Sequence, residues 1–239
     1  MSQGPIGRQA LVVRGGWDGH HPIEGTDLFL PFLERSGFEL RVEDSPEIYA
    51  DAHYMATVDV VLQLVTMSTA SDEAVNGLRG AVASGTGLAG WHGGIADSFR
   101  ASSDYLQLIG GQFVTHPSKR PDLVVGDDSD NYLPYVVELT ELGRAHEILA
   151  GLDDFALETE QYWVLHDDLI DVLATTTHPV QPYHPWHRQI VSPAVWTREW
   201  GAGRVFVCTP GHSLDVLENP TVRTIIERGI LWASRTVSE

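Results

Sequence analysis

Short apolar runs alternate with segments of helical spacing through the first half of the chain. Four apolar runs are typical of buried parallel strands, and they cover residues 9–14, 38–42, 58–65 and 86–91. Between them, apolar residues recur at helical spacing over 28–36 and 69–84, and Gly37 ends the first of these helices. Strands and helices that alternate in this order predict an α/β fold with a doubly wound, mostly parallel sheet.

The second half of the chain alternates apolar and polar residues in shorter segments. This alternation predicts an antiparallel addition to the sheet, with strands over 123–126, 135–139, 155–165, 172–177 and 191–200. An apolar strand over 204–208 and a closing helix over 220–233 follow. No internal repeat and no interdomain linker interrupts the pattern, so we predict a single domain over residues 1–239.

The segment Gly90-Trp91-His92-Gly93-Gly94 has the outline of a nucleophile elbow, a sharp turn between a strand and a helix. Glycines flank the apex because a Cβ there would clash with the neighbouring backbone. The apex residue stands at the carboxyl edge of the sheet, where open α/β folds bind ligands. His92 takes the place of the Ser or Cys of a hydrolase, so the pattern predicts retained geometry with different chemistry. An ordinary glycine-rich turn is the alternative.

Three further segments are expected to reach the same edge of the sheet as His92. They contribute Trp17, Asp18 and His20 from the loop after the first strand, Glu160 and Tyr162 from the antiparallel addition, and His212 from the loop after the last strand. Imidazoles titrate near neutral pH and bind metals through a neutral nitrogen. A group of them at one edge therefore predicts acid–base or metal chemistry.

The other histidines have no supporting context for chemistry. We expect surface positions for His53, His146, His166, His178, His184 and His187. The last three lie in the stretch 178–188, which is rich in Pro and His and is predicted to be a surface loop rather than a metal site. Cys208 lies within an apolar strand and is expected to be buried as a small hydrophobe, and Trp163 is expected to pack in the core.

Composition and charge narrow the range of partners. The 239-residue chain has a formal charge of −18 and no basic stripe, which argues against nucleic acid or an anionic membrane as a partner. No run approaches the ~20 apolar residues of a membrane helix, and the first nine residues lack a secretory signal, so a cytoplasmic location is predicted. Glycine-rich phosphate-binding motifs are absent, so no nucleotide cofactor is expected. A homo-oligomer is left open.

Several segments spread along the chain match the pattern of one family. They are Gly90–Gly94, Gly110–Phe113 with His116 and Pro117, His146–Tyr162 with Glu160 and Tyr162 in an acidic-x-Tyr position, Trp196, and Gly201–His212. Through them the sequence resembles the trehalose-utilisation (ThuA-like) family over nearly its whole length. The resemblance implies the flavodoxin-like fold of class I glutamine amidotransferases.

The residues of the amidotransferase reaction are missing from this chain. In the related amidotransferases the elbow carries Cys, and the last strand leads to a His with an acid two residues later. This chain has His92 at the elbow, His212 after the last strand and Leu214 where the acid would stand. Glutamine hydrolysis by thiolate attack is therefore excluded by residue chemistry. The resemblance implies sugar metabolism instead, because family members are often linked with oxidoreductases that make 3-keto sugars.

The first functional hypothesis is an enzyme that acts on a 3-keto disaccharide or glycoside. A ketone at C3 acidifies the adjacent C–H, so a base such as His92 or Glu160 supports elimination or isomerisation. The catalytic candidates are His92, Glu160 and His212. The candidate ligands of a divalent ion such as zinc or manganese are His20, His92 and His212, with Glu160 as a further ligand. The candidate sugar-binding residues are Trp17, Asp18, Trp91, His116 and Tyr162.

Two other functions remain open at the level of sequence. A fold that lost the Cys and the acid of an amidotransferase is compatible with a non-catalytic sugar-binding module. An amide or ester hydrolase that uses metal-bound water in place of the thiolate is the third hypothesis. Turnover of a keto sugar would separate the first function from the second.

Overall fold

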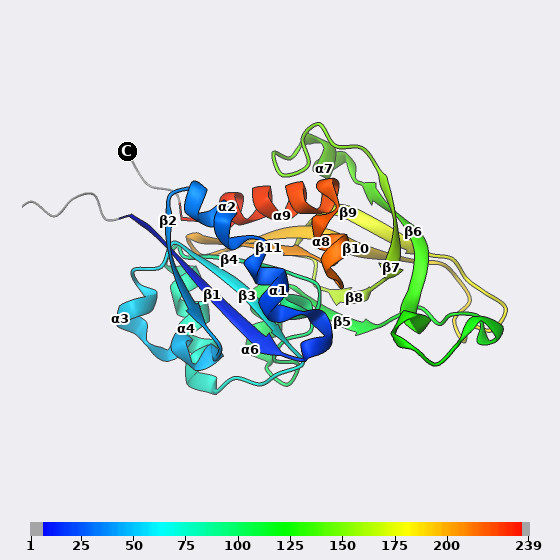
Figure 1. The fold of residues 1–239 in the computed structure, drawn as a ribbon, viewed down its shortest axis with the longest axis horizontal. Helices are drawn as coiled ribbons and strands as arrows, with labels where there is room; N and C mark the ends of the chain where they lie inside the picture. The colour runs from blue at the N-terminus through cyan, green and yellow to red at the C-terminus, as the bar shows by residue number, and fades with distance from the viewer. Residues whose placement is uncertain (1–6, 236–239) are drawn as a thin grey trace, which may run out of the picture.

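The computed structural model describes residues 7–235, which form a nine-stranded sheet with helices on both faces (Figure 1). The strand order is β2-β1-β3-β4-β11-β10-β9-β6-β7, and β5 and β8 form a separate two-stranded sheet. The strands are β1 (Arg8–Gly16), β2 (Phe38–Glu43), β3 (Val60–Thr66), β4 (Gly87–Trp91), β5 (Gly111–Thr115), β6 (Tyr132–Leu139), β7 (Phe155–Glu160), β8 (Trp163–His166), β9 (Asp171–His178), β10 (Ile190–Trp200) and β11 (Gly203–Cys208).

The helices divide between the two faces of the sheet. In Figure 1, α1, α2, α8 and α9 lie on one face, and α3, α4 and α6 lie on the other. The helices are α1 (Pro22–Asp27), α2 (Leu30–Arg35), α3 (Ala52–Met55), α4 (Asp72–Ala83), α5 (Gly93–Ala96), α6 (Ser103–Ile109), α7 (Glu141–Ala145), α8 (Leu214–Glu218) and α9 (Pro220–Ala233). Short 3₁₀ helices are η1 (Asp18–His20), η2 (Pro46–Ala50), η3 (Pro121–Leu123) and η4 (Asp128–Asn131).

Both faces of the central strands are buried, which explains why these strands read as continuous apolar runs. Every residue of β3 is buried. Successive residues of β1 point to opposite sides: Val12 packs into the core beneath α2 and α9, and Leu11 packs into the core beneath α4 and α6. The sequence prediction of an α/β fold with parallel strands and an antiparallel addition is confirmed.

Strand direction places the carboxyl ends of seven strands at one edge of the sheet. The strands β1, β3, β4 and β11 are mutually parallel. β10 is antiparallel to β11 and β9 is antiparallel to β10, so β9 runs in the direction of β11. β6 is antiparallel to both β9 and β7, so β7 also runs in that direction. β2 is parallel to β1 as well, so the carboxyl ends of β1, β2, β3, β4, β7, β9 and β11 lie at one edge.

The structure corrects three local predictions in the second half. Of residues 123–126, predicted to be a strand, Leu123 ends the 3₁₀ helix η3 and the other three join no sheet. The predicted strand over 155–165 is two strands, because the chain leaves the large sheet after Glu160 and β8 pairs with β5 instead. His178, predicted to lie in a surface loop, is the last residue of β9 and is 1% exposed.

Within residues 7–235, no helix has the length and apolar character needed to cross a membrane.

Candidate metal centre

His92 stands at a turn of unusual backbone geometry between β4 and α5. Its φ of 48° and ψ of −142° lie in a region that residues with a side chain rarely adopt. A Cβ on Gly90 would lie 2.5 Å from the carbonyl oxygen of Gln63, and one on Gly93 would lie 2.5 Å from Cε1 of His20. The glycines are therefore required by close approach, and the turn has the sharp shape that the sequence predicts.

The loops at this edge carry further backbone strain. Besides His92, His21 has a φ of 46° after β1 and Met67 has a φ of 51° after β3. Each such residue costs on the order of 1–3 kcal/mol unless the surroundings hold it in place. Strained loops gathered around one point are typical of a functional site rather than of a structural turn.

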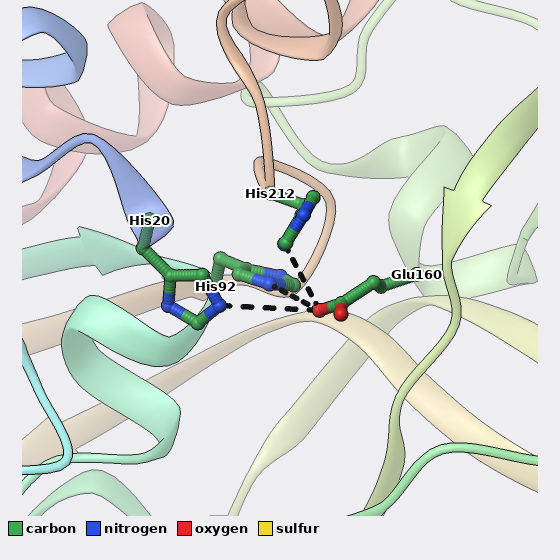
Figure 2. A group of neighbouring side chains, drawn as sticks. All are labelled: His20, His92, Glu160 and His212. Carbon is green, nitrogen blue, oxygen red and sulfur yellow. Dashed lines mark hydrogen bonds and ion pairs between the residues drawn. The ribbon is translucent and has the colours of Figure 1, made fainter. Parts of the chain in front are cut away.

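Four ligand-type side chains converge at this edge from four segments (Figure 2). One oxygen of Glu160, Oε2, lies 3.1 Å from Nε2 of His92, 3.0 Å from Nδ1 of His212 and 3.9 Å from Nε2 of His20. The four ligand atoms all lie within 4.8 Å of one another. His20 comes from the loop after β1, His212 from the loop after β11, and Glu160 from the end of β7.

A fifth side chain, His116, borders this group after β5. Its Nε2 lies 3.4 Å from the same Glu160 oxygen. His116 is the most exposed of the four imidazoles that face this carboxylate, with 19% of its side chain exposed. It therefore stands on the solvent side of the cluster.

The hydrogen bonds of two rings fix which nitrogen carries the proton. Nδ1 of His92 lies 2.8 Å from the carbonyl oxygen of Thr209, and Nδ1 of His116 lies 3.2 Å from that of Gln161. A carbonyl only accepts, so both Nδ1 atoms donate, and each neutral ring then presents the Nε2 lone pair to Glu160. Lone pairs that face a carboxylate oxygen repel it unless a proton or a cation lies between them.

Burial favours the neutral form of the rings. It lowers the pKa of His92 to about 4 and, together with the neighbouring imidazoles His92 and His212, that of His20 to about 2. Burial also lowers the pKa of His116. Burial alone would raise the pKa of Glu160, but the contact from His212, the closest of the imidazoles, opposes burial and lowers that pKa. Near neutral pH, His20, His92 and His116 are thus neutral rings around an ionised Glu160.

These features fit a divalent cation. A metal-bound histidine typically donates its other ring N–H to a backbone carbonyl, as His92 does here. Nδ1 of His212 is buried and has no hydrogen-bond partner among the described residues, although Glu160 is close. Three imidazoles and one carboxylate are a donor set that suits zinc or manganese better than calcium.

The space beside the cluster is small. A cavity of about 10 Å³ lies between His20, Thr66, Trp91 and His92. A cavity of this size holds about one water-sized particle. A sugar ring does not fit there.

Apart from His116, whose position is described above, the predicted sugar-binding residues fall into two groups. Trp17 is 47% exposed, with its ring 4.7 Å from that of His20, and Asp18 is exposed beside it. Their role in sugar binding stays a prediction. Trp91 is 1% exposed and packs against Phe29, and the buried Tyr162 lies against the ring of His92 at 4.2 Å. Burial leaves neither ring a face for a sugar, so these two support the site from within.

Sequence reasoning missed several contacts of Glu160. Nδ2 of Asn131 lies 3.4 Å from its Oε1, and the hydroxyl of Tyr135 donates to its backbone carbonyl. The ring of Tyr132 lies 5.4 Å from that of His212. These residues belong to η4 and β6, and no local motif marks them. Only the pairing of β6 with β7 brings them to the site.

Comparison with known proteins agrees with this reading of the fold. A family model named ThuA and described as trehalose utilisation matches residues 9–233. The chain belongs to the ThuA family. The match covers His20, His92, Glu160 and His212, so the whole candidate centre lies inside the ThuA region. No protein with a curated description matches the chain.

Solved structures show the same fold at low sequence identity. A ThuA-like protein from Parabacteroides merdae is 17% identical, with a TM-score of 0.69 over 97% of this chain and 92% of that one. A ThuA-like protein from Bacteroides uniformis is 15% identical, with a TM-score of 0.68 over 94% and 89%. A GH42 β-galactosidase from G. stearothermophilus is 15% identical, with a TM-score of 0.53 over 96% of this chain and 31% of that one.

Proposed function

We propose that this ThuA-family protein is a metal-dependent enzyme that acts on a sugar carrying a ketone, as a disaccharide or glycoside. The observation that carries the proposal is the group His20, His92, Glu160 and His212, whose ligand atoms lie within 4.8 Å of one another. The family's role in trehalose utilisation supports a sugar as substrate. The buried, strained setting of His92 supports a site built for chemistry.

The four residues would hold the ion, with the rings of His20, His92 and His212 neutral and Glu160 ionised. A divalent ion so held supplies a Lewis acid that polarises a carbonyl oxygen. His92 keeps its orientation through the bond from Nδ1 to Thr209. The ligand role would occupy the Nε2 lone pair of His92 and the Oε2 atom of Glu160, the two bases considered from the sequence.

His116 is better placed than either to act as the base. It is the most exposed of the imidazoles that face Glu160, its Nδ1 donates to Gln161, and its Nε2 lone pair faces the cluster. A C–H next to a ketone is acidic enough for a neutral imidazole to take its proton when the developing enolate is stabilised. The electron pair left on carbon then supports either isomerisation or loss of the group on the neighbouring carbon.

The first test is the metal content of the purified protein. We expect about one equivalent of zinc or manganese per chain in the wild type, and loss of the metal in His92→Ala and His212→Ala. His53→Ala is the matched control, because His53 is exposed and distant in sequence from the cluster. A wild type without metal, or metal retained in both cluster variants, contradicts the proposal.

Turnover is the second part of the test. The metal-loaded protein is incubated with 3-keto trehalose, and glucose release is followed together with loss of the ketone. We expect turnover that falls at least about 100-fold in His116→Ala, because general-base catalysis typically contributes 10²–10⁴-fold. Binding of the sugar without product would favour a sugar-binding module instead.

A further inference from the structure

A cavity of about 470 Å³ lies next to the candidate metal centre, on the exposed side of β6 and β9. Its walls include Pro117, Pro134 and Pro179, with Tyr183 from the segment that follows β9. The volume is in the range of small-molecule sites. The cavity is far larger than the space beside His92.

Two residues that line this cavity are sequence neighbours of residues at the candidate metal centre. Pro117 and Gln161 line the cavity, and they directly follow His116 and Glu160 in the chain. The hydroxyl of Tyr135, another lining residue, donates to the backbone carbonyl of Glu160. The cavity wall and the candidate centre therefore use neighbouring residues of the same two segments.

The cavity wall contains a buried acceptor without a partner. His178 is 1% exposed, and its Nε2 donates to the carbonyl oxygen of Tyr162 at 3.0 Å. Its Nδ1 therefore carries a lone pair, and this atom has no hydrogen-bond partner among the described residues. An unpaired buried acceptor costs about 1–3 kcal/mol, which a ligand's donor would offset.

A donor without a partner stands in the same wall. The backbone N–H of Gln181 donates to Nδ1 of His184, so the proton of this neutral ring is on Nε2. That Nε2 is buried and has no hydrogen-bond partner in the described part of the chain. The cavity wall thus contains one acceptor, on His178, and one donor, on His184, that no other described residue satisfies.

The remaining walls of the cavity are largely apolar, which suits the C–H face of a sugar ring. Proline rings and the ring of Tyr183, which is 39% exposed, present flat apolar surface of the kind on which the C–H faces of a pyranose pack. Glu138 also lines the cavity and disfavours an anionic ligand. We propose that this cavity binds a neutral sugar ring, namely the ring of the substrate that does not react. The proposal rests on the proposed function for the identity of the second ring.

The test follows the imidazole nitrogens of His178 and His184 by ¹⁵N NMR during titration with trehalose, which carries no ketone and does not react. We expect saturable shifts of Nδ1 of His178 and Nε2 of His184. In His184→Ala, the Kd for trehalose rises about fivefold or more through loss of one hydrogen bond. His187→Ala is the matched control, since His187 is an exposed histidine of the same segment, and it leaves Kd within about twofold.

Two further arms separate this proposal from the metal proposal. In the presence of a chelator the trehalose shifts persist, because the cavity contains no proposed metal ligand. Sorbitol, which has hydroxyl groups but no ring, binds more weakly than glucose. The proposal is overturned if trehalose moves neither resonance, if Kd is unchanged in His184→Ala, or if binding disappears with the metal.

Discussion

Two regions of the chain contribute side chains to the candidate metal centre, and different interactions hold each of them in place. The loops after β1, β4 and β11 supply the histidines, and tight backbone packing fixes each of these loops. The end of β7 supplies Glu160, which is held by strand pairing with β6 and by side-chain contacts. The first region is specified locally by glycines and strained turns, and the second by contacts between segments far apart in the sequence. The first region thus supplies the imidazoles of the candidate centre, and the second supplies its carboxylate.

The largest expected effect on stability comes from a substitution in the turn at His92. Gly90→Ala places a Cβ 2.5 Å from the carbonyl oxygen of Gln63 and 2.8 Å from Cβ of Ile95. We expect a loss of roughly 3–5 kcal/mol in the free energy of unfolding, because neither neighbour is the flexible end of a side chain. Urea unfolding measures this loss.

Gly80→Ala is the control for that experiment. Gly80 lies in α4, and a Cβ there meets nothing within 4 Å. Removing a glycine from an exposed helix position stabilises the protein by roughly 0.5–1 kcal/mol. Equal effects of the two substitutions would show that the turn at His92 is not tightly packed.

The second largest effect is the loss of folding stability at acidic pH. His92 has a pKa of 6.5 in an unfolded chain and about 4 in the folded one, because burial disfavours its charged form. Between these values the unfolded state binds more protons, so stability falls as the pH falls from 6.5 to 4. At about 1.4 kcal/mol per pKa unit, His92 alone accounts for roughly 3 kcal/mol of that loss.

Urea unfolding with a chelator at pH 7 and pH 4.5 tests this effect. The loss on acidification should be smaller in His92→Gln than in the wild type. His53→Gln, which changes an exposed ring, should leave the loss unchanged. An identical loss in His92→Gln and the wild type would mean that His92 is not held neutral by its loop.

The smallest effect concerns Glu160, at the end of β7. Its replacement should stabilise the metal-free protein and weaken metal binding. In Glu160→Gln an amide N–H can donate to the Nε2 lone pair of His92 or His116, so the chelated variant should be more stable by about 1 kcal/mol. With zinc, loss of the carboxylate should weaken metal binding about tenfold or more. Thermal unfolding with and without zinc measures both.

Glu158→Gln is the control for this change, because Glu158 is an exposed residue of the same strand. It should alter neither value. If Glu160→Gln destabilises the chelated protein, the lone pairs of the imidazoles do not face an unrelieved carboxylate.

The same contrast explains what the sequence predicts well. The strands β1, β3, β4 and β11 are buried on both faces, so their apolar runs identify them without knowledge of their partners. The turn at His92 is recognisable because its glycines are required locally. The positions of His20 and His212 follow from strand direction alone.

The antiparallel half is less predictable because pairing decides it. Nothing in residues 155–165 shows that the chain changes sheets after Glu160, since β8 finds its partner in β5 about 50 residues away. His178 was expected in a loop because prolines follow it, whereas its pairing with Ile190 extends β9. His116 carried no local signal beyond the family resemblance.

The order of strands has a consequence for synthesis of the chain. The strand β11 lies between β4 and β10, although it follows every other strand of the described residues in the chain. Until residue 208 has emerged, the hydrogen-bonding edge of β4 lacks its partner, and so does that of β10. The nascent protein therefore carries two unfinished sheets with open, apolar edges, a state that invites association with other chains. Insertion of β11 closes both gaps in one step and brings His212 to Glu160.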